Sequence, residues 1–485
     1  MKKILNIVAG FLVLLFAVAC HDDMGNYDYN YMGDVYVTNF ADANFSYKYG
    51  SQILIEPTIL TNIPEKELGY MWLLNVNGLR FDTLSLERNL DVLAHFETSS
   101  VEFRVIHEPS GVHYTFGTQI TVSEPFSSGW GFLSSTSSAG EFSFLSDVER
   151  GVNNTILWEY YPMVYQNVND ESLMANVHTL GHNGGFGQWI ITGDDEGYIL
   201  NAENMEKENM ASEYFAAPEY LTSSFSPAYI GFTDDEVSKS IRFITTGGDL
   251  FAATQINYGY PFDFYAPISG EHYIGDKLTR VGNDMVYLVF DEATRRYLYV
   301  NLRNSNAKSQ EVLKVDGTPD ASDIDVNNLG MDCVYLKYAG ISWDKPAIYS
   351  ILKDDNGAFH LHAMDTNVSG PWDPNPYDIR INSVQNIDPK YIDDDTKIFI
   401  PDGTKNMFFV KGNQVHVYVG SNNVFVENWY EADDTILDFY FTTSGEFAVA
   451  LSDGENSLVE IRSTKDQTVI TTVEVNGILK DMVRI

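Results

Sequence analysis

Cysteine is scarce in this chain of 485 residues, because only Cys20 and Cys333 are present. Two cysteines cannot form the disulfide framework of a small secreted domain, nor a zinc site with three or four thiolates. Cys333 lies in the apolar stretch 331–335, where an isolated cysteine usually packs as a small hydrophobic side chain. The sequence therefore predicts no cysteine-based metal centre.

Basic residues are also few, since 30 Lys and Arg stand against 68 Asp and Glu and give a net charge of -38. A surface of this sign repels phosphate backbones and anionic lipid headgroups. We therefore expect no nucleic acid partner and no adhesion of the protein surface to anionic lipid. The requirement for solubility alone accounts for most of these charges.

Sustained helical patterns and membrane-spanning apolar runs are missing as well. The apolar run 4–18 is shorter than the roughly 20 residues that a spanning helix needs. Residues 202–212 (AENMEKENMAS) are the one segment predicted to be helical, and they lack a clear apolar face. Elsewhere, short apolar alternations end at Gly, Asn or Asp, which is typical of strands and turns. The predicted fold class is all-β.

The first residues have the parts of a secretory signal peptide. Lys2 and Lys3 precede the apolar run, and small residues lie directly before Cys20. A cysteine in this place resembles a bacterial lipobox, where the thiol is acylated and becomes the new N-terminus. Several acyl chains hold a protein stably on a membrane. We therefore predict a signal peptide at 1–19 and a lipidated tether at 20–33, which leaves Cys333 without a disulfide partner.

Residues 34–124 are predicted to form a first domain of β-strands. Ile53 and Ile55 alternate with more polar positions, and the segment 101–105 alternates cleanly. Trp72 lies in an apolar stretch that we predict to be a central strand. About seven strands in roughly 90 residues, with one buried tryptophan, fit an immunoglobulin-like sandwich.

Residues 125–485 are predicted to form a second domain built from repeated hairpins. Turn-forming residues recur at intervals of roughly 40 to 60 residues, which is the range of propeller blades. They lie at 146–149, 193–197, 246–249, 291–294, 354–357, 411–413 and 452–455. One hairpin cannot bury its own apolar face, so a closed ring of hairpins is favoured. We predict a seven-bladed β-propeller, with two consecutive sandwiches as the alternative.

Several segments resemble one known family. Residues 20–29 (CHDDMGNYDY) are similar to the start of the PKD-like family lipoproteins of Bacteroidota, and 21–23 resemble the acidic signal that sends such lipoproteins to the outer face of the outer membrane. Later landmarks of that family resemble 70–72, 101–105, 111–114 and 129–133. The resemblance implies an extracellular-facing lipoprotein associated with a SusC/SusD-type TonB-dependent uptake system. It provides no catalytic residue.

The histidine pairs in this sequence do not match metal-binding motifs, because either their spacing is wrong or too few ligands are present. His107 begins a sequence like HExxH, but the next histidine is His113, which one helix face cannot present beside the first. His360 and His362 would share one face of a strand and could both reach a metal. Because no neighbouring carboxylate can be identified, we predict no metal site and no catalytic residue.

A calcium site is only partly supported. Asp323, Asp325 and Asn327 alternate as in a calcium loop, but the later glycine and glutamate of an EF-hand are absent. We therefore predict no cofactor, and a structural calcium ion in the acidic loops stays open.

Two loop segments rich in aromatic residues are the predicted ligand-binding regions. Gly and Pro within 258–265 and 371–377 oppose regular strands and favour rings at a surface, where they stack on sugars or grip peptide side chains. The predicted ligand-binding residues are Tyr258, Tyr260, Phe262, Tyr265, Trp372 and Tyr377. Packing between blades is the alternative use of these rings. Trp189, Trp343 and Trp429 are assigned to the core.

The predicted function is that of an accessory surface lipoprotein. It would bind oligopeptide or oligosaccharide cargo, or dock to a SusCD-type transporter, without being an enzyme. Its contact with the membrane would be through the lipid anchor alone. The alternatives are a propeller glycosidase or polysaccharide lyase with a carboxylate or histidine in the central funnel, and a purely structural subunit of the transporter complex.

Overall fold

A computed structural model of the chain describes two compact units, Met1–Ser123 and Glu124–Ile485. The described residues are 33–40, 45–48, 51–76, 80–94, 96, 98–123, 125–150, 156–183, 187–216, 225–235, 239–256, 264, 266–281, 286–301, 309–311, 313–314, 324–339, 347–367, 378–452 and 454–485. The predicted signal peptide and Cys20 lie outside them. Within these ranges, no helix is both long enough and apolar enough to cross a membrane.

The first unit consists of short strands in one larger sheet and two smaller ones. The five-stranded sheet has the order β2 (Phe45–Lys48), β9 (Val112–Ser123), β8 (Ser99–His107), β5 (Leu68–Asn75) and β6 (Phe81–Ser85). The two-stranded sheets are β1 (Val35–Thr38) with β4 (Thr58–Thr61), and β3 (Gln52–Ile55) with β7 (Leu90–Leu93). A 3-10 turn, η1 (Glu65–Glu67), precedes β5. The pair β2–β9 is parallel, and the other pairs are antiparallel.

The core of the first unit is centred on Trp72. The Trp72 and Phe103 rings are fully buried with their centroids 4.4 Å apart, and Phe40 meets Trp72 edge-on. Trp72 Nε1 donates to the Glu87 carbonyl at 3.0 Å, so the buried N–H is satisfied. In β3 and β8 alternate side chains are buried, which confirms the alternation predicted from the sequence.

The second unit is built from sheets of three to five strands that follow one another along the chain. The first three sheets are β12 (Ile156–Tyr161), β11 (Gly140–Arg150), β10 (Gly129–Ser135) and β37 (Ile478–Arg484); β13 (Val177–Asn183), β14 (Gln188–Gly193), β15 (Gly197–Asn201) and β16 (Lys207–Met210); and β17 (Pro227–Asp235), β18 (Lys239–Thr246) and β19 (Asp249–Ile256). Two short helices, α2 (Val164–Asn169) and η3 (Ala211–Tyr214), accompany them.

The remaining sheets continue this order. They are β20 (Ile274–Arg280), β21 (Val286–Asp291), β22 (Arg296–Asn301) and β23 (Ser309–Glu311); β24 (Leu313–Lys314), β28 (Asp378–Ile387), β27 (Phe359–Asn367), β26 (Ala347–Lys353) and β25 (Asp332–Tyr338); β29 (Lys397–Phe399), β30 (Asn406–Lys411), β31 (Gln414–Val419) and β32 (Val424–Glu431); and β33 (Ile436–Phe441), β34 (Glu446–Ser452), β35 (Ser457–Ser463) and β36 (Val469–Val475).

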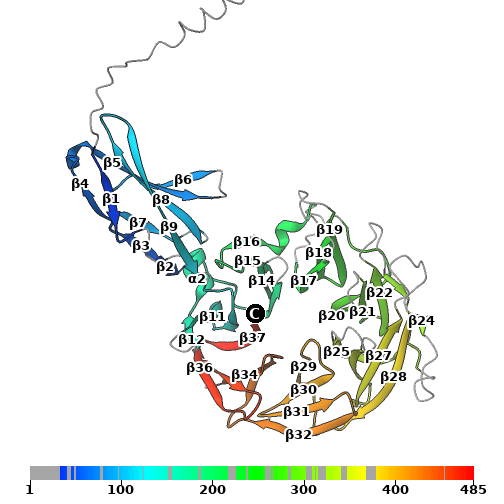
Figure 1. The fold of residues 1–485 in the computed structure, drawn as a ribbon. Helices are drawn as coiled ribbons and strands as arrows, with labels where there is room; N and C mark the ends of the chain where they lie inside the picture. The colour runs from blue at the N-terminus through cyan, green and yellow to red at the C-terminus, as the bar shows by residue number, and fades with distance from the viewer. Residues whose placement is uncertain are drawn as a thin grey trace, which may run out of the picture. The chain divides into compact units, whose positions relative to one another are not determined.

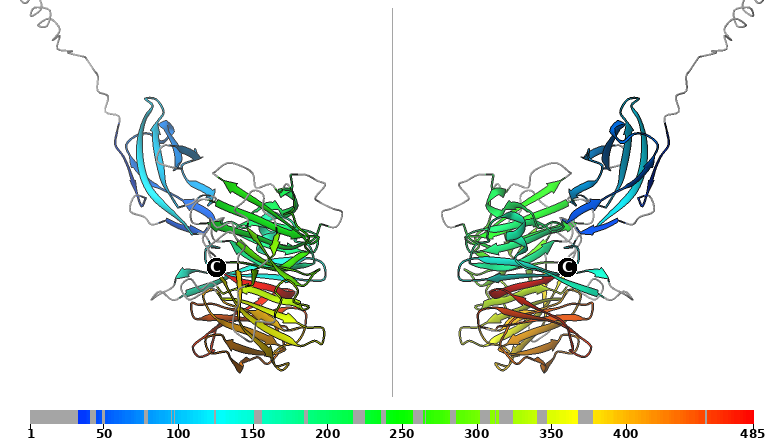
Figure 2. Two further views of the ribbon diagram at one scale, coloured as in Figure 1. Left: turned by 90° about the vertical axis from the view of Figure 1, so that its right-hand side faces the viewer. Right: turned by 90° about the vertical axis from the view of Figure 1, so that its left-hand side faces the viewer.

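These sheets stand around a common centre, with β29 nearest the centre of the ring and β32 at its outside (Figure 1). Buried apolar clusters fill the space between each sheet and the next. The ring is closed by β37, the last strand, which pairs antiparallel with β10, the first strand of the unit. Figure 2 shows the red β37 beside the teal strands of this sheet. The arrangement is all-β, as predicted, and is typical of a β-propeller.

Six of the seven hairpin turns predicted for this unit join paired strands as expected. The turn predicted at 146–149 is wrong, because these residues belong to β11, where the register with β12 shifts between Ser146 and Glu149. The hairpin of that sheet lies instead between Ser135 and Gly140. A strand irregularity tolerates the same polar residues as a turn, which explains the error.

The helix predicted at 202–212 is also wrong. Residues 202–204 form a turn, and 207–212 form β16 and the beginning of η3. Without an apolar face, a helix here would have no packing to offset its nucleation cost, whereas β16 gains backbone hydrogen bonds by pairing with β15. The charged residues Lys207 and Glu208 also suit an edge strand.

Candidate functional site

The aromatic residues predicted to bind a ligand lie outside the described residues. They are Tyr258, Tyr260, Phe262, Tyr265, Trp372 and Tyr377. Phe264, within the same stretch, is described and is 1% exposed. It packs against Phe215 and Phe251 between two neighbouring sheets, as the packing alternative expects for rings of this stretch.

Of the three tryptophans predicted to lie in the core, the two that the structure describes differ in how far they are buried. Trp189 is fully buried between Phe142 and Phe144, so its assignment is confirmed. Trp429 is partly buried and packs against the cluster between the sheets of β30 and β34. Trp343 lies outside the described residues.

A cavity of about 520 Å³ lies where three loops of the second unit meet. The loops precede β29, join β30 to β31, and precede β33. Their lining residues are Lys390, Asp393, Asp395, Lys397, Val410, Lys411, Gly412, Gln414, Thr435 and Ile436. Three of these ten residues are lysines, although acidic residues outnumber basic ones 68 to 30 in the chain. We refer to this space as the lysine cavity.

The loops around the lysine cavity are held by backbone and side-chain hydrogen bonds. The Ile436 amide donates to the Gly412 carbonyl at 2.9 Å. Gly412 has a φ of +63°, a conformation that glycine adopts without strain. The Thr396 hydroxyl donates to Asp393 Oδ1 at 2.7 Å and, with Lys411, lowers the pKa of Asp393. These hydrogen bonds hold the loops around the cavity in place without a ligand.

Lys411 is the most firmly placed of the three lysines. Its Nζ donates to the Pro389 carbonyl at 2.6 Å and lies 3.2 Å from Asp393 Oδ2. Its side chain is 28% exposed. Because an ammonium group has three N–H donors, one donor of Lys411 is left for a ligand.

Lys390 and Lys397 are also oriented by neighbours. Lys390 Nζ lies 3.1 Å from Glu427 Oε2 and 4.6 Å from the centre of the Tyr391 ring. Interaction with Tyr391, and then with Glu427, raises the pKa of Lys390. Lys397 Nζ lies 3.4 Å from Asp438 Oδ1, which belongs to the inner strand β33. The second and third ammonium groups thus keep donors of their own.

Asp438 and Asp481 form a partly buried carboxyl pair beside Lys397. Burial raises the pKa of both groups, and the charge of Asp438 further raises the pKa of Asp481 to about 8. Asp481 Oδ2 accepts the Leu180 amide at 2.7 Å, and its Oδ1 accepts the Met482 amide at 2.9 Å. Both oxygens of Asp481 are therefore engaged by backbone, and the residue links β37 to β13.

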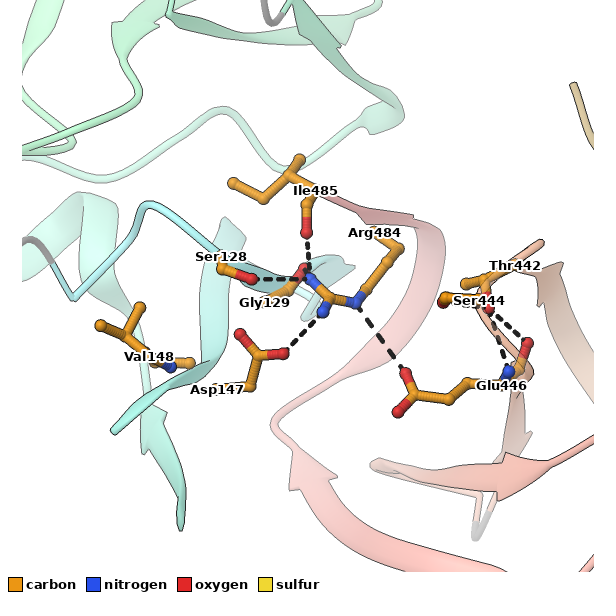
Figure 3. Close-up of polar contacts among 10 residues, drawn as sticks. Ser128, Gly129, Asp147, Val148, Thr442, Ser444, Glu446, Arg484 and Ile485 are labelled. Atoms are coloured by element: carbon orange, nitrogen blue, oxygen red, sulfur yellow. Dashed lines mark hydrogen bonds and ion pairs between the residues drawn. The ribbon is translucent and has the colours of Figure 1, made fainter. Parts of the chain in front are cut away.

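A second charged cluster lies at the end of β37, around Arg484 (Figure 3). Arg484 Nη2 donates to Asp147 Oδ2 at 2.6 Å, Nη1 donates to the Gly129 carbonyl at 2.9 Å, and Nε lies 4.0 Å from Glu446 Oε2. Burial raises the pKa of Glu446, which Arg484 opposes. Each of these contacts joins β37 to another strand: Asp147 lies in β11, Gly129 in β10 and Glu446 in β34. The cluster therefore helps to close the ring.

The histidine pair on β27 does not gather metal ligands. His360 Nε2 lies 3.2 Å from Asp354 Oδ2, whereas His362 is 1% exposed. Burial, and then His360, lowers the pKa of His362 to about 4. Among the residues that the structure describes, no group of three or more His, Cys, Asp or Glu side chains could hold a metal ion. The calcium site stays a prediction, because Asp323 lies outside this part of the chain.

The lysine cavity was not predicted from the sequence. Lys390, Lys397, Lys405 and Lys411 fall within 22 residues, a high density for this acidic chain, but their spacing matches no binding motif. Only folding brings the three loops together. The signal that could have found the site is therefore the local density of lysine.

Residues 20–176 match the sequence model of the PKD-like family. This match supports the predicted PKD-like domain. It begins at Cys20 and extends beyond the first unit into β10, β11, β12 and α2 of the second. A search of curated proteins gives no match to this sequence.

Solved structures resemble the chain only distantly. A quinonprotein alcohol dehydrogenase-like protein from Bacteroides thetaiotaomicron is 12% identical with a TM-score of 0.47, covering 93% of this chain and 99% of that one. The periplasmic gluconolactonase of Pseudomonas aeruginosa is 10% identical with a TM-score of 0.48, covering 74% of this chain and 99% of that one. At these values the likeness supports no conclusion about activity.

Proposed function

We propose that this protein is an accessory lipoprotein, anchored by lipid at Cys20 on the extracellular side of the outer membrane. It binds oligopeptide or oligosaccharide cargo for a SusCD-type TonB-dependent uptake system and catalyses no reaction. The signal-like segment 1–19, the tether 20–33 and the PKD-like match from residue 20 support this location.

We also propose the finer architecture. Residues 34–124 would be an immunoglobulin-like sandwich, supported by the small sheets β1–β4 and β3–β7 beside the five-stranded sheet. Residues 125–485 would be a seven-bladed β-propeller in which each sheet of the ring is one blade. The support for this is the apolar cluster between each sheet and the next.

The observation that carries the binding function is the lysine cavity. Its volume of about 520 Å³ falls within the range of small-molecule sites. Its lining offers ammonium donors, carboxylate acceptors and an amide, which are groups that hold a polar cargo by hydrogen bonds.

A propeller glycosidase or polysaccharide lyase is the second candidate function. The observation in its favour is the Asp438–Asp481 pair, because a carboxyl group that keeps its proton near neutral pH can act as a general acid. Against it, both oxygens of Asp481 already accept backbone N–H groups. Turnover of a glycan panel by the purified protein, lost in Asp438→Asn, would establish this function.

The first test is a pull-down of the tagged lipoprotein from detergent-solubilised outer membranes, followed by mass spectrometry. We expect a SusC/SusD pair in stoichiometric amount. The control is Cys20→Ala, which should lose the anchor and reduce the yield of transporter. A lipoprotein recovered alone would contradict the accessory function. Co-purification without any cargo binding would instead favour the purely structural subunit.

A further inference from the structure

We infer that the lysine cavity binds a carboxylate group of the cargo. This inference rests on the proposed binding function and adds the chemical class of the ligand. Three lysines line the cavity, Lys390 before β29, Lys397 at the start of β29 and Lys411 at the end of β30. Charge-assisted hydrogen bonds from fixed ammonium groups are the interactions that carboxylates accept most strongly.

The lysines are positioned for this use in advance. Lys411 is tied to the Pro389 carbonyl and to Asp393, and Lys390 to Glu427. These partners leave at least one N–H of each ammonium group free, since each has three. A ligand that binds Lys411 therefore does not have to order a flexible side chain, which otherwise costs binding free energy.

The charge of -38 on the whole chain does not exclude an anionic ligand. At physiological ionic strength, charges beyond about 8 Å are largely screened. Within that range the three lysines are paired with Asp393, Glu427 and Asp438, so the N–H groups that the lysines retain, and not a net positive charge, hold the carboxylate. The field of the whole chain should lower the association rate rather than abolish binding.

Asp395 further restricts which ligands can bind in the cavity. Its carboxylate lines the same space and repels an anion placed beside it. It accepts a hydrogen bond from a hydroxyl or an ammonium group. The ligand that satisfies both features carries a carboxylate next to such a donor. Acidic peptides and oligosaccharides of uronic acids both meet this description.

The test is isothermal titration calorimetry on the mature chain carrying Cys20→Ala, with four probes. Triglutamate and trigalacturonate are the acidic probes, and triglutamine and trigalactose are their neutral counterparts. We expect at least one acidic probe to bind about tenfold more tightly than its counterpart, a ratio that one charge-assisted hydrogen bond supplies. The acidic probe that binds distinguishes a peptide source from a uronate source.

Variants locate the binding in the cavity. Lys411→Gln should weaken the acidic probe about tenfold, and Lys397→Gln serves the same purpose if the first variant does not fold. Asp395→Asn should tighten the acidic probe by about two- to threefold, because it removes a like charge. Lys465→Gln, at an exposed site on another loop, is the matched control and should change nothing.

Two outcomes would overturn the inference. The first is acidic probes that bind no more tightly than the neutral ones, and the second is acidic binding that survives both lysine substitutions. Binding of a neutral probe at the cavity would still leave the proposed function in place. The pull-down tests association with the transporter separately. Failure of the carboxylate proposal can therefore be distinguished from failure of the proposed function.

Discussion

The sheet that closes the ring and the sheets made of successive hairpins are held together in different ways. In the sheet of β33 to β36, each strand pairs with its neighbour in sequence, and Arg462 bonds to Glu460 two residues away. In the closing sheet, β10 pairs with β37, and Arg484 bonds to Asp147 across 337 residues. Closing the ring therefore requires contacts that bear a large loop entropy, and the buried Asp147 takes part in one of them.

Removal of β37 should have the largest effect on this comparison. A chain that ends at Gly477 loses Leu479 and Met482, which are buried beside Trp130. Each such side chain contributes about 2–5 kcal/mol when buried, so the second unit should lose its cooperative unfolding transition. Guanidinium unfolding followed by tryptophan fluorescence measures this. Lys480→Ala, on the exposed face of the same strand, is the control; a truncated chain with an unchanged midpoint would contradict closure by β37.

The next largest effect should be a difference in stability loss between substitutions of two arginines with similar exposure. Arg484→Met leaves Asp147, which is 6% exposed, without its cation and should cost about 3 kcal/mol in free energy of unfolding. Arg462→Met breaks a local pair and should cost about 1 kcal/mol. Urea unfolding of both variants compares them. Equal losses would show that sequence separation does not matter, and Asp147→Leu combined with Arg484→Met should recover part of the larger loss.

The same distinction decides what could be predicted from the sequence. Local turn residues such as those at 354–357 and 411–413 identify hairpins, because their backbone preferences act on neighbouring residues. Asp147 was assigned to a turn for the same reason, but its partner Arg484 lies at the far end of the chain and leaves no local signal. The lysine cavity could not be predicted from the sequence for the same reason, because its lysines come together only when three loops fold.

Acid should affect a sheet of successive strands through His362 on β27. Burial lowers the pKa of this residue from its usual value of 6.5 to about 4. The neutral ring therefore stabilises the fold fully above pH 6.5, and this contribution falls as pH drops towards 4, by about 3 kcal/mol in total. His362→Leu should show a smaller loss in urea unfolding between pH 6.5 and 4. His178→Gln, at an exposed site, should retain the wild-type loss, and a slope unchanged in His362→Leu would contradict this assignment.

Rising pH should act on the closing strand with the opposite sign, through Asp481. Its pKa is raised by burial, and then by Asp438, from 3.8 to about 8. A raised carboxyl pKa stabilises the fold below the unfolded value, and this contribution is lost as pH rises towards 8. Asp481→Asn should therefore flatten the decline in unfolding free energy between about pH 4 and 8. It should also lower stability by about 1 kcal/mol at pH 5, because the amide cannot accept both backbone N–H groups.

Asp438→Asn sharpens the same test. Without the charge of Asp438, the pKa of Asp481 should fall, and the decline should end at lower pH. Asp466→Asn, an exposed carboxyl whose pKa is lowered, should leave the decline between about pH 4 and 8 unchanged. If Asp481→Asn keeps the wild-type slope, the pair does not hold a proton, and β37 is joined to β13 by an ionised carboxylate. In that case the two kinds of sheet would differ in sequence separation alone, and not in their response to pH.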